Sequence, residues 1–292
     1  MWGATPTIGR LLAHYEAPEL LTFFRFVAAS TFLYFAASKH QSLLARLQLR
    51  DLPLYLLLGL TGICMHNVLM FWGLEHADAT RGSIIMGFIS IMVALLEFVF
   101  FGIRLSVIAL VGIGLGFIGM SIVVSDGNVS SLTSGNVGFG DVLLIASALS
   151  WALYSVISRP ILQRVSPLDL TAFACLTGTV MLLPMLANNL PTAAAMLTDP
   201  TAVVLIGLSG LLGSGIGYLW YYEGVKELGS VGTVMYVNLM PVTGVIIAAL
   251  TLKESPTVSA IIGGSCVIFG VMLVNRPKRP NGNLSPAKEK TN

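Results

Sequence analysis

Few residues in the chain can do chemistry, and most of them lie inside long apolar runs. His66 and Asn67 lie near the middle of the run 53–75. A neutral imidazole there can donate a hydrogen bond to a carboxylate or amide, accept one from an ammonium group, and stack through its flat face. Because polar side chains in hydrocarbon normally face a cavity or the protein interior, we expect both residues to line a site. A histidine packed against a neighbouring helix carbonyl would fit the same pattern.

Aromatic side chains form a second group of candidates. Trp2 and Trp151 could be two walls of one cavity, since aromatic walls suit planar ligands by stacking and cations through the ring quadrupole. Tyr218 and Tyr222 are one helical turn apart and present their hydroxyls on one face. Helix packing or a place at the membrane interface would explain the same residues. The predicted substrate-binding residues are Trp2, His66, Asn67, Ser90, Trp151, Tyr154, Tyr218, Tyr222 and Asn238.

Charged residues within the runs are rarer, and we expect them to point away from the site. Arg25 lies in the outer half of its run, where it could attract an anionic group from outside. We favour the alternative that its long side chain reaches the outer interface or pairs with a helix end. Glu97 is about five residues from the end of its run, so it can reach the interface in the same way. These assignments leave no carboxylate at mid-membrane.

Catalysis, metal binding and cofactor binding have no support in the sequence. The three cysteines occur singly, without Cys-x-x-Cys spacing or a paired histidine, and we interpret them as packing residues. His66 and Ser214 invite comparison with an intramembrane serine protease. However, the run Gly213-Ser214-Gly215 lacks the usual Gly-x-Ser spacing. We therefore predict no enzyme, no metal and no cofactor.

The composition indicates an integral membrane protein. Of 292 residues, 55% are apolar and only 10% are Asp, Glu, Lys or Arg, whereas soluble domains carry about 25%. The mean hydropathy of +0.84 agrees with this. The composition excludes a secreted disulfide scaffold, a nucleic-acid-binding protein and a cytosolic enzyme, and the net charge of +2 implies no polyanionic partner.

Ten apolar runs are candidates for membrane-crossing helices of an all-α protein. They cover approximately 1–13, 17–38, 53–75, 79–102, 104–125, 140–160, 168–190, 199–224, 229–252 and 256–275. The first run is too short to cross alone and has no basic n-region, so we expect no signal peptide. We expect the numbered sequence to lack the first half of that helix.

The positions of Lys and Arg orient these helices. Of 16 such residues, only Arg10, Arg81 and Lys253 lie in connections that face outward if the N-terminus is cytoplasmic, whereas twelve lie in inner connections and the tail. Both termini of this multi-pass, inner-membrane protein are therefore predicted to be cytoplasmic. The Gly-, Ser- and Asn-rich linker 126–139 is then external, and the tail 276–292 is a disordered segment near the inner leaflet.

The two halves of the chain match each other. At an offset of 149, Trp2 matches Trp151; from the third run onward the offset is 151, as for Gly62 and Gly213. Because five runs is an odd number, the second copy must cross the membrane in the opposite sense. The predicted units are a first five-helix repeat 1–125, the linker 126–139, an inverted five-helix repeat 140–275 and the tail 276–292. Inverted repeats are typical of alternating-access transporters whose substrate site lies where the copies meet.

Four motifs resemble the EamA-type drug/metabolite transporter superfamily. They are Trp2 in the first helix, Pro18 to Arg25, Asn238 to Val242 and Leu252 to Ser255. The resemblance covers residues 1–275 and implies ten helices, as two inverted five-helix repeats around a central cavity. Within this superfamily the chain is similar to the bacterial aromatic amino acid and methyl viologen exporters (YddG type).

We therefore predict an alternating-access transporter that exports small metabolites, with aromatic or other neutral amino acids as first choice. Its partners are a small-molecule substrate and membrane lipid, with no nucleic acid. A broad-specificity exporter of cationic or other compounds, with or without proton antiport, is the alternative. Phosphorylated sugars would need Lys or Arg in the cavity and rank lower. An intramembrane enzyme and a channel are remote alternatives, and the oligomeric state stays open, a monomer included.

The predicted topology can be tested with an impermeant thiol reagent. Cysteines introduced at Ser131 and Ser285 should label from opposite sides of the membrane, because the first lies in the external linker and the second in the cytoplasmic tail. Labelling of both positions from outside would contradict the inverted repeat.

Overall fold

The apolar runs fold into helices, and most helix ends lie close to the predicted ones. The exception lies between the eighth and ninth runs, where the helix Gly217–Val237 passes the predicted boundary and contains non-helical backbone at Gly229. The computed structural model describes residues 2–39, 42–102, 106–127, 138–237, 239–253 and 256–274. The helices of the first half are α1 (Thr5–Leu11, after a 3-10 turn Trp2–Ala4), α2 (Pro18–Ala37), α3 (Leu52–Leu58), α4 (His66–Glu75), α5 (Ala79–Gly87), α6 (Ile89–Phe101) and α7 (Val107–Val124). The helices of the second half are α9 (Phe139–Ile161), α10 (Pro167–Asn188), α11 (Leu190–Thr198), α12 (Pro200–Leu208), α13 (Gly217–Val237), α14 (Leu239–Thr251) and α15 (Val258–Val274).

Seven helical segments in the described ranges are long and apolar enough to cross a membrane. Two of them combine several helices: Leu49–Glu75 contains α3 and α4, and Pro200–Ser230 contains α12 and most of α13. The apolar helix α15 is shorter, at 17 residues. The protein is therefore an all-helical, multi-pass membrane protein. Of the predicted linker and tail, 128–137 and 276–292 lie outside the described residues.

π-helical turns interrupt both of the composite segments. They are η5 (Gly59–Met65) between α3 and α4, and η6 (Ser209–Ile216) between α12 and α13. The hydrophobic pattern does not predict them, because a π-helical turn changes the backbone bonding from i→i+4 to i→i+5 without changing composition. The two turns occupy matching positions of the two halves. Glycine is needed in them for close approach: a Cβ on Gly210 would lie 2.6 Å from the carbonyl oxygen of Arg25.

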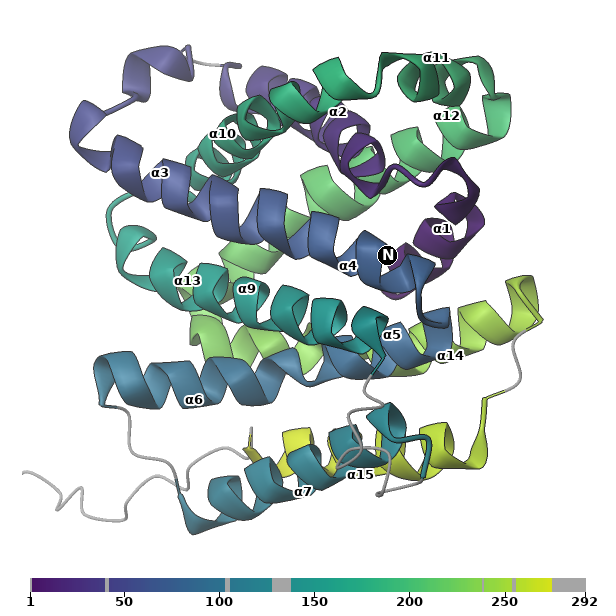
Figure 1. Ribbon diagram of the computed structural model, residues 1–292. Helices are drawn as coiled ribbons and strands as arrows, with labels where there is room; N and C mark the ends of the chain where they lie inside the picture. Colours follow the sequence, from purple (N-terminus) through teal and green to yellow (C-terminus); the bar gives the residue numbers. More distant parts are fainter. Residues whose placement is uncertain are drawn as a thin grey trace, which may run out of the picture.

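The helices α7 and α15 lie side by side at one edge of the molecule (Figure 1). Their backbones meet at two glycine pairs. A Cβ on Gly112 would lie 2.5 Å from the carbonyl oxygen of Gly270, and a Cβ on Gly119 would lie 2.5 Å from that of Gly263. Such small-residue interfaces let helices in a membrane approach closely and gain van der Waals contact.

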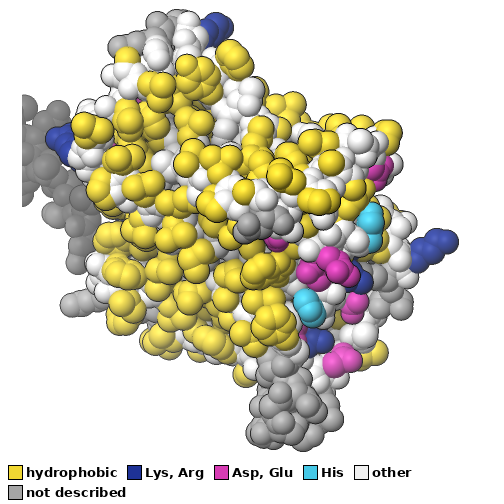
Figure 2. All heavy atoms as spheres, turned by 45° about the horizontal axis from the view of Figure 1, so that its top comes forward, with side chains coloured by type: hydrophobic (Ala, Val, Ile, Leu, Met, Phe, Trp, Pro, Cys, Tyr) yellow, Lys and Arg dark blue, Asp and Glu magenta, His cyan; other side chains and the backbone are white. Residues whose placement is uncertain are grey.

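Apolar side chains cover much of the outer surface. Figure 2 shows a broad hydrophobic face, with most acidic and histidine side chains toward the right of the view and basic side chains at several places around its edge. Large apolar residues that are more than half exposed occur on several helices: Phe35, Val99, Ile118, Leu250, Phe269 and Met272. This surface is what a lipid solvent requires.

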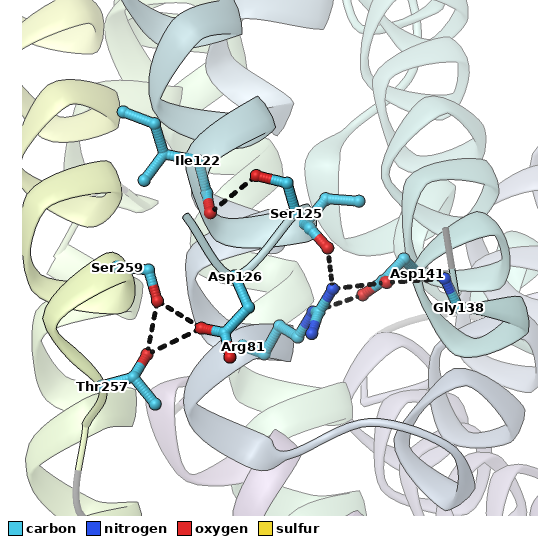
Figure 3. Close-up of polar contacts among 9 residues, drawn as sticks. Arg81, Ile122, Ser125, Asp126, Gly138, Asp141, Thr257 and Ser259 are labelled. Carbon is cyan, nitrogen blue, oxygen red and sulfur yellow. Dashed lines mark hydrogen bonds and ion pairs between the residues drawn. The ribbon is translucent and has the colours of Figure 1, made fainter. Parts of the chain in front are cut away.

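Polar contacts connect helix ends near the predicted linker (Figure 3). Arg81, at the start of α5, forms an ion pair with Asp141 at the start of α9, with Nε and Oδ1 2.6 Å apart. The same guanidinium donates to the carbonyl of Val124 at the end of α7. Asp126 accepts a hydrogen bond from Ser259 at the start of α15. These contacts join the ends of four helices.

A second ion pair joins α9 to α6, in the C-terminal part of each helix. Arg159 Nη1 lies 3.1 Å from Glu97 Oε1, and Glu97 is 3% exposed. The prediction that Glu97 extends to the interface is therefore wrong. A basic residue on the neighbouring helix is within reach of this carboxylate, so Glu97 pairs inside the protein.

The glycine contacts between α7 and α15 give a stability prediction. Gly119→Ala should lower the free energy of unfolding by about 1–3 kcal/mol, because the new methyl group meets the backbone of Gly263. Gly114→Ala is the matched control, since a Cβ there meets no atom within 4 Å while the change in helix propensity is the same. Unfolding in mixed micelles measures both variants. Equal effects would show that close approach is not the constraint at Gly119.

Candidate functional site

A cavity at the centre of the helices brings together residues that are far apart in the sequence. Its polar and aromatic lining comes from Trp2, Arg25, His66, Asn67, Trp151 and Tyr218. Trp2 precedes α1, Arg25 lies on α2, and Trp151 lies on α9. His66 and Asn67 begin α4, directly after η5, and Tyr218 follows η6 in the same way. The cavity is small, about 30 Å³, whereas ligand pockets typically measure roughly 300–1,000 Å³.

The predicted pair of tryptophans forms the aromatic part of the site. The rings of Trp2 and Trp151 meet edge to face, with centroids 5.2 Å apart. Tyr218 completes the group at 5.0 Å from Trp151 and 5.7 Å from Trp2. Edge-to-face contacts of this kind contribute about 0.5–1.5 kcal/mol beyond burial. The two tryptophans are thus in direct contact, and both line the cavity.

Trp2 also borders a larger and more apolar hollow of about 520 Å³ between α13 and α14. Val237 and Met240 line both spaces, so these three side chains separate the central cavity from the hollow. The indole nitrogen of Trp2 donates to the carbonyl of Gly213 in η6, with a distance of 2.8 Å. This bond fixes the ring at the boundary.

Asn67 is the centre of a hydrogen-bond network that includes a π-helical carbonyl. Its amide nitrogen donates to the Tyr218 hydroxyl and to the Gly62 carbonyl of η5, each at 3.1 Å. The Tyr218 hydroxyl in turn donates to the same carbonyl at 3.2 Å. The Asn67 oxygen accepts from Arg25 Nη1 at 3.4 Å. Asn67 therefore connects α2, η5 and α13.

His66 is held by Ser147 on α9. Its Nδ1 lies 3.0 Å from the Ser147 carbonyl oxygen, while the Ser147 hydroxyl donates to the His66 carbonyl at 2.6 Å. Because a carbonyl can only accept, Nδ1 carries the proton of a neutral ring and Nε2 is left as an acceptor. The imidazole packs on Trp151, with centroids 4.7 Å apart. Both interpretations of the sequence thus hold for His66: it bonds to a neighbouring helix carbonyl, and it lines the cavity.

The position of the Arg25 side chain differs from the predicted one. It does not extend to the interface: it is 2% exposed and lines the central cavity. Its Nη2 donates to the Ser214 hydroxyl at 2.9 Å, and Phe71 lies under the guanidinium at 5.3 Å. The sequence did contain an indication, since Arg25 follows Pro18 by seven residues, about 10 Å of helix. That depth is far enough from the end of α2 for the side chain to meet neighbouring helices.

The other predicted residues lie behind the cavity or outside the described residues. Tyr154 and Tyr222 are fully buried, with ring centroids 5.3 Å apart, and do not line the cavity. Ser90 is buried next to the lining residue Ile89 but is not itself in the lining. Asn238 lies outside the described residues.

Tyr221 is a further aromatic residue next to the cluster, although it is not among the predicted substrate-binding residues. Tyr221 packs 5.6 Å from Trp2 and donates to the Ser155 hydroxyl at 2.7 Å. Its position in the sequence between Tyr218 and Tyr222, which are both predicted site residues, is a signal that could have identified it.

The geometry does not form a protease site. Ser214 bonds to Arg25 and His66 bonds to Ser147, so no hydrogen bond joins Ser214 to His66 in the described chain. Among the residues that the structure describes, no three His, Cys, Asp or Glu side chains are close enough to hold a metal ion. The lining of the cavity instead consists of aromatic rings that can stack and polar side chains that can form hydrogen bonds.

The contact between Arg25 and Asn67 can be tested with a double-mutant cycle. Asn67→Leu should lower the free energy of unfolding by about 1–3 kcal/mol, because it leaves buried donors and acceptors unpaired. Combined with Arg25→Met, the loss should be smaller than the sum of the single losses by about 0.5–3 kcal/mol. Additive losses would mean that the two side chains do not interact.

Comparison with known proteins identifies a family that matches most of the chain. Residues 1–125 and 138–276 match the EamA-like transporter family. The uncharacterized transporter YyaM of Bacillus subtilis is 27% identical over 92% of this chain and 88% of its own. A probable terminal-alkyne amino-acid exporter of Streptantibioticus cattleyicolor is 31% identical over 78% of this chain and 74% of its own.

A solved crystal structure has the same fold. It superposes with a TM-score of 0.61 at 19% identity and covers 93% of this chain and 94% of that chain. Similarity at this level of identity concerns the fold alone. The family match makes the protein a transporter of small molecules and not an enzyme. The chain belongs to the EamA-like transporter family.

Proposed function

We propose that the protein exports small metabolites, aromatic or other neutral amino acids first among them, from the cytoplasm by alternating access. The observation that carries this proposal is the meeting of repeat-related residues at one cavity. Trp2 and Trp151, matched at the offset of 149, are in ring contact. Asn67 and Tyr218, matched at 151, share a hydrogen bond. In inverted-repeat transporters the substrate site lies where the two copies meet.

The proposed inverted repeat has further support in the pattern of helix contacts. In a two-fold arrangement, if residue i meets the mate of j, then j meets the mate of i. Gly112 and Gly119 are matched with Gly263 and Gly270 at the offset of 151, and the contacts are Gly112 with Gly270 and Gly119 with Gly263. On α2 and α10, the matched hydroxyls of Ser30 and Thr179 meet at 3.1 Å, as residues on the axis would. We therefore propose ten helices in two units, 1–125 and 140–275.

The lining of the cavity supports aromatic amino acids as substrates. Trp2, Trp151 and Tyr218 present edges and faces to a planar side chain, and His66 and Asn67 add donors and acceptors. Because the cavity is much smaller than an amino acid, the helices must separate for substrate to enter. The name of the Streptantibioticus relative, a probable terminal-alkyne amino-acid exporter, agrees with an amino acid as cargo.

A broad-specificity exporter of cations is the second candidate, because tryptophan and tyrosine faces also bind cations. The buried guanidinium of Arg25 opposes it, since a like charge at close range in a site of low dielectric is repulsive.

We also propose that the protein lies in the inner membrane with both termini in the cytoplasm. The distribution of Lys and Arg supports this orientation.

Counterflow of radiolabelled tryptophan in proteoliposomes tests the proposal. At matched pH on both sides, the wild-type protein should exchange tryptophan, and Trp151→Ala should reduce this exchange by several-fold because it removes three aromatic contacts of the site. Trp72→Ala is the control, since Trp72 is 40% exposed and does not line the cavity. Equal loss of tryptophan and threonine exchange in Trp151→Ala would mean that the ring holds helices together and does not recognise substrate.

A further inference from the structure

The guanidinium of Arg25 has no counter-charge in the described chain. The four ion pairs of the described residues use Arg46, Arg81, Arg159 and Arg164, each with an aspartate or glutamate. Arg25, with 2% of its surface exposed, has only neutral hydrogen-bond partners. A buried charge without an opposite charge is costly and calls for an anion or water in reach.

The geometry leaves part of the guanidinium available. Nη2 is held by Ser214 at 2.9 Å and Nη1 is loosely held by Asn67 at 3.4 Å. Nε is buried and has no hydrogen-bond partner. Five donors in a planar fork suit a carboxylate, which accepts two parallel bonds. The neutral partners thus orient the group without satisfying its charge.

We propose that Arg25 binds the carboxylate of the transported substrate, so that the protein selects substrates by this group. The inference rests on the proposed transport function and names the chemical class of its substrate. The aromatic side chain would lie against Trp2, Trp151 and Tyr218, which line the same cavity. An α-ammonium group, when present, has the Nε2 acceptor of His66 and the indole faces as partners.

The charge of the site favours a carboxylate over a phosphate. One guanidinium neutralises one negative charge, so a carboxylate leaves the pair neutral. A phosphate dianion would leave an excess negative charge in a site where the described lining offers no second cation. An amine without a carboxylate would add a second positive charge beside Arg25.

Three indole compounds separate these groups in one experiment. Competition with tryptophan counterflow should be strong for tryptophan and for indole-3-propionate, which keeps the carboxylate and lacks the ammonium. Tryptamine, which keeps the ammonium and lacks the carboxylate, should compete at least about tenfold more weakly. Equal competition by tryptamine would overturn the proposal.

Variants test the role of Arg25 directly. Arg25→Gln should weaken competition by both carboxylates about tenfold or more and leave that by tryptamine unchanged or stronger. Arg10→Gln is the control, because Arg10 donates to the Leu74 carbonyl and does not line the central cavity. Asn67→Asp places a carboxylate beside Arg25, and should therefore abolish competition by carboxylates.

Thermal stability separates failure of this inference from failure of the proposed function. Indole-3-propionate and acetate should raise the melting temperature of the detergent-purified protein, by about 2 °C or more for the former, and Arg25→Gln should lose both shifts. These shifts without any counterflow would contradict tryptophan transport and support the carboxylate site. Tryptophan counterflow without a carboxylate-specific shift in melting temperature would support tryptophan transport and contradict the carboxylate site. A larger shift with inorganic phosphate than with acetate would assign Arg25 to phosphorylated ligands and overturn the proposal.

Discussion

The structure depends on the need to satisfy backbone carbonyls inside hydrocarbon, where no water is available to bond them. Both π-helical turns lie at the cavity, and the carbonyls of Gly62 and Gly213 within them accept hydrogen bonds from side chains. Those side chains are Asn67, Tyr218 and Trp2, the residues that build the site. The irregular backbone and the side chains that line the cavity are therefore coupled, because these side chains satisfy the carbonyls of the π-helical turns and the carbonyls hold the side chains in place.

The two halves supply the same frame but different chemistry. The tryptophans are matched, yet the mate of Arg25 is Ala174 and the mate of His66 is Gly217. The guanidinium and the imidazole thus come from the first half, while the second half adds hydroxyls from Ser147, Ser214 and Tyr218. Glycine at position 217 has a steric reason, because a Cβ there would lie 2.7 Å from Nε1 of Trp2. In the first half the matching pair is His66 and Trp151, whose rings pack against each other. A cavity between similar halves can in this way hold a substrate with two different ends.

The length of the apolar runs predicted the helices, because burial in lipid imposes a simple pattern on each span. Internal matching predicted that Trp2 and Trp151 belong together, and the rarity of polar residues singled out His66, Asn67 and Tyr218, all of which line the cavity. These predictions depend on composition and spacing, which can be read directly from the sequence. The depth of a side chain along the membrane normal and its direction around the helix axis are harder to predict. Tyr154 and Tyr222, one turn from lining residues, accordingly lie behind the cavity.

The errors on Arg25 and Glu97 have a common physical cause. Long charged side chains near a helix end were expected to extend to water, which is the favourable choice for an isolated helix. Inside a bundle the choice depends on the partner that another helix offers: Arg159 for Glu97, and Ser214 with Asn67 for Arg25. Glu97 gains an opposite charge and becomes a structural contact. Arg25 gains only neutral partners among the described residues, so its burial is not explained by the stability of the protein alone. This difference from Glu97 is the basis for proposing an anionic ligand for Arg25.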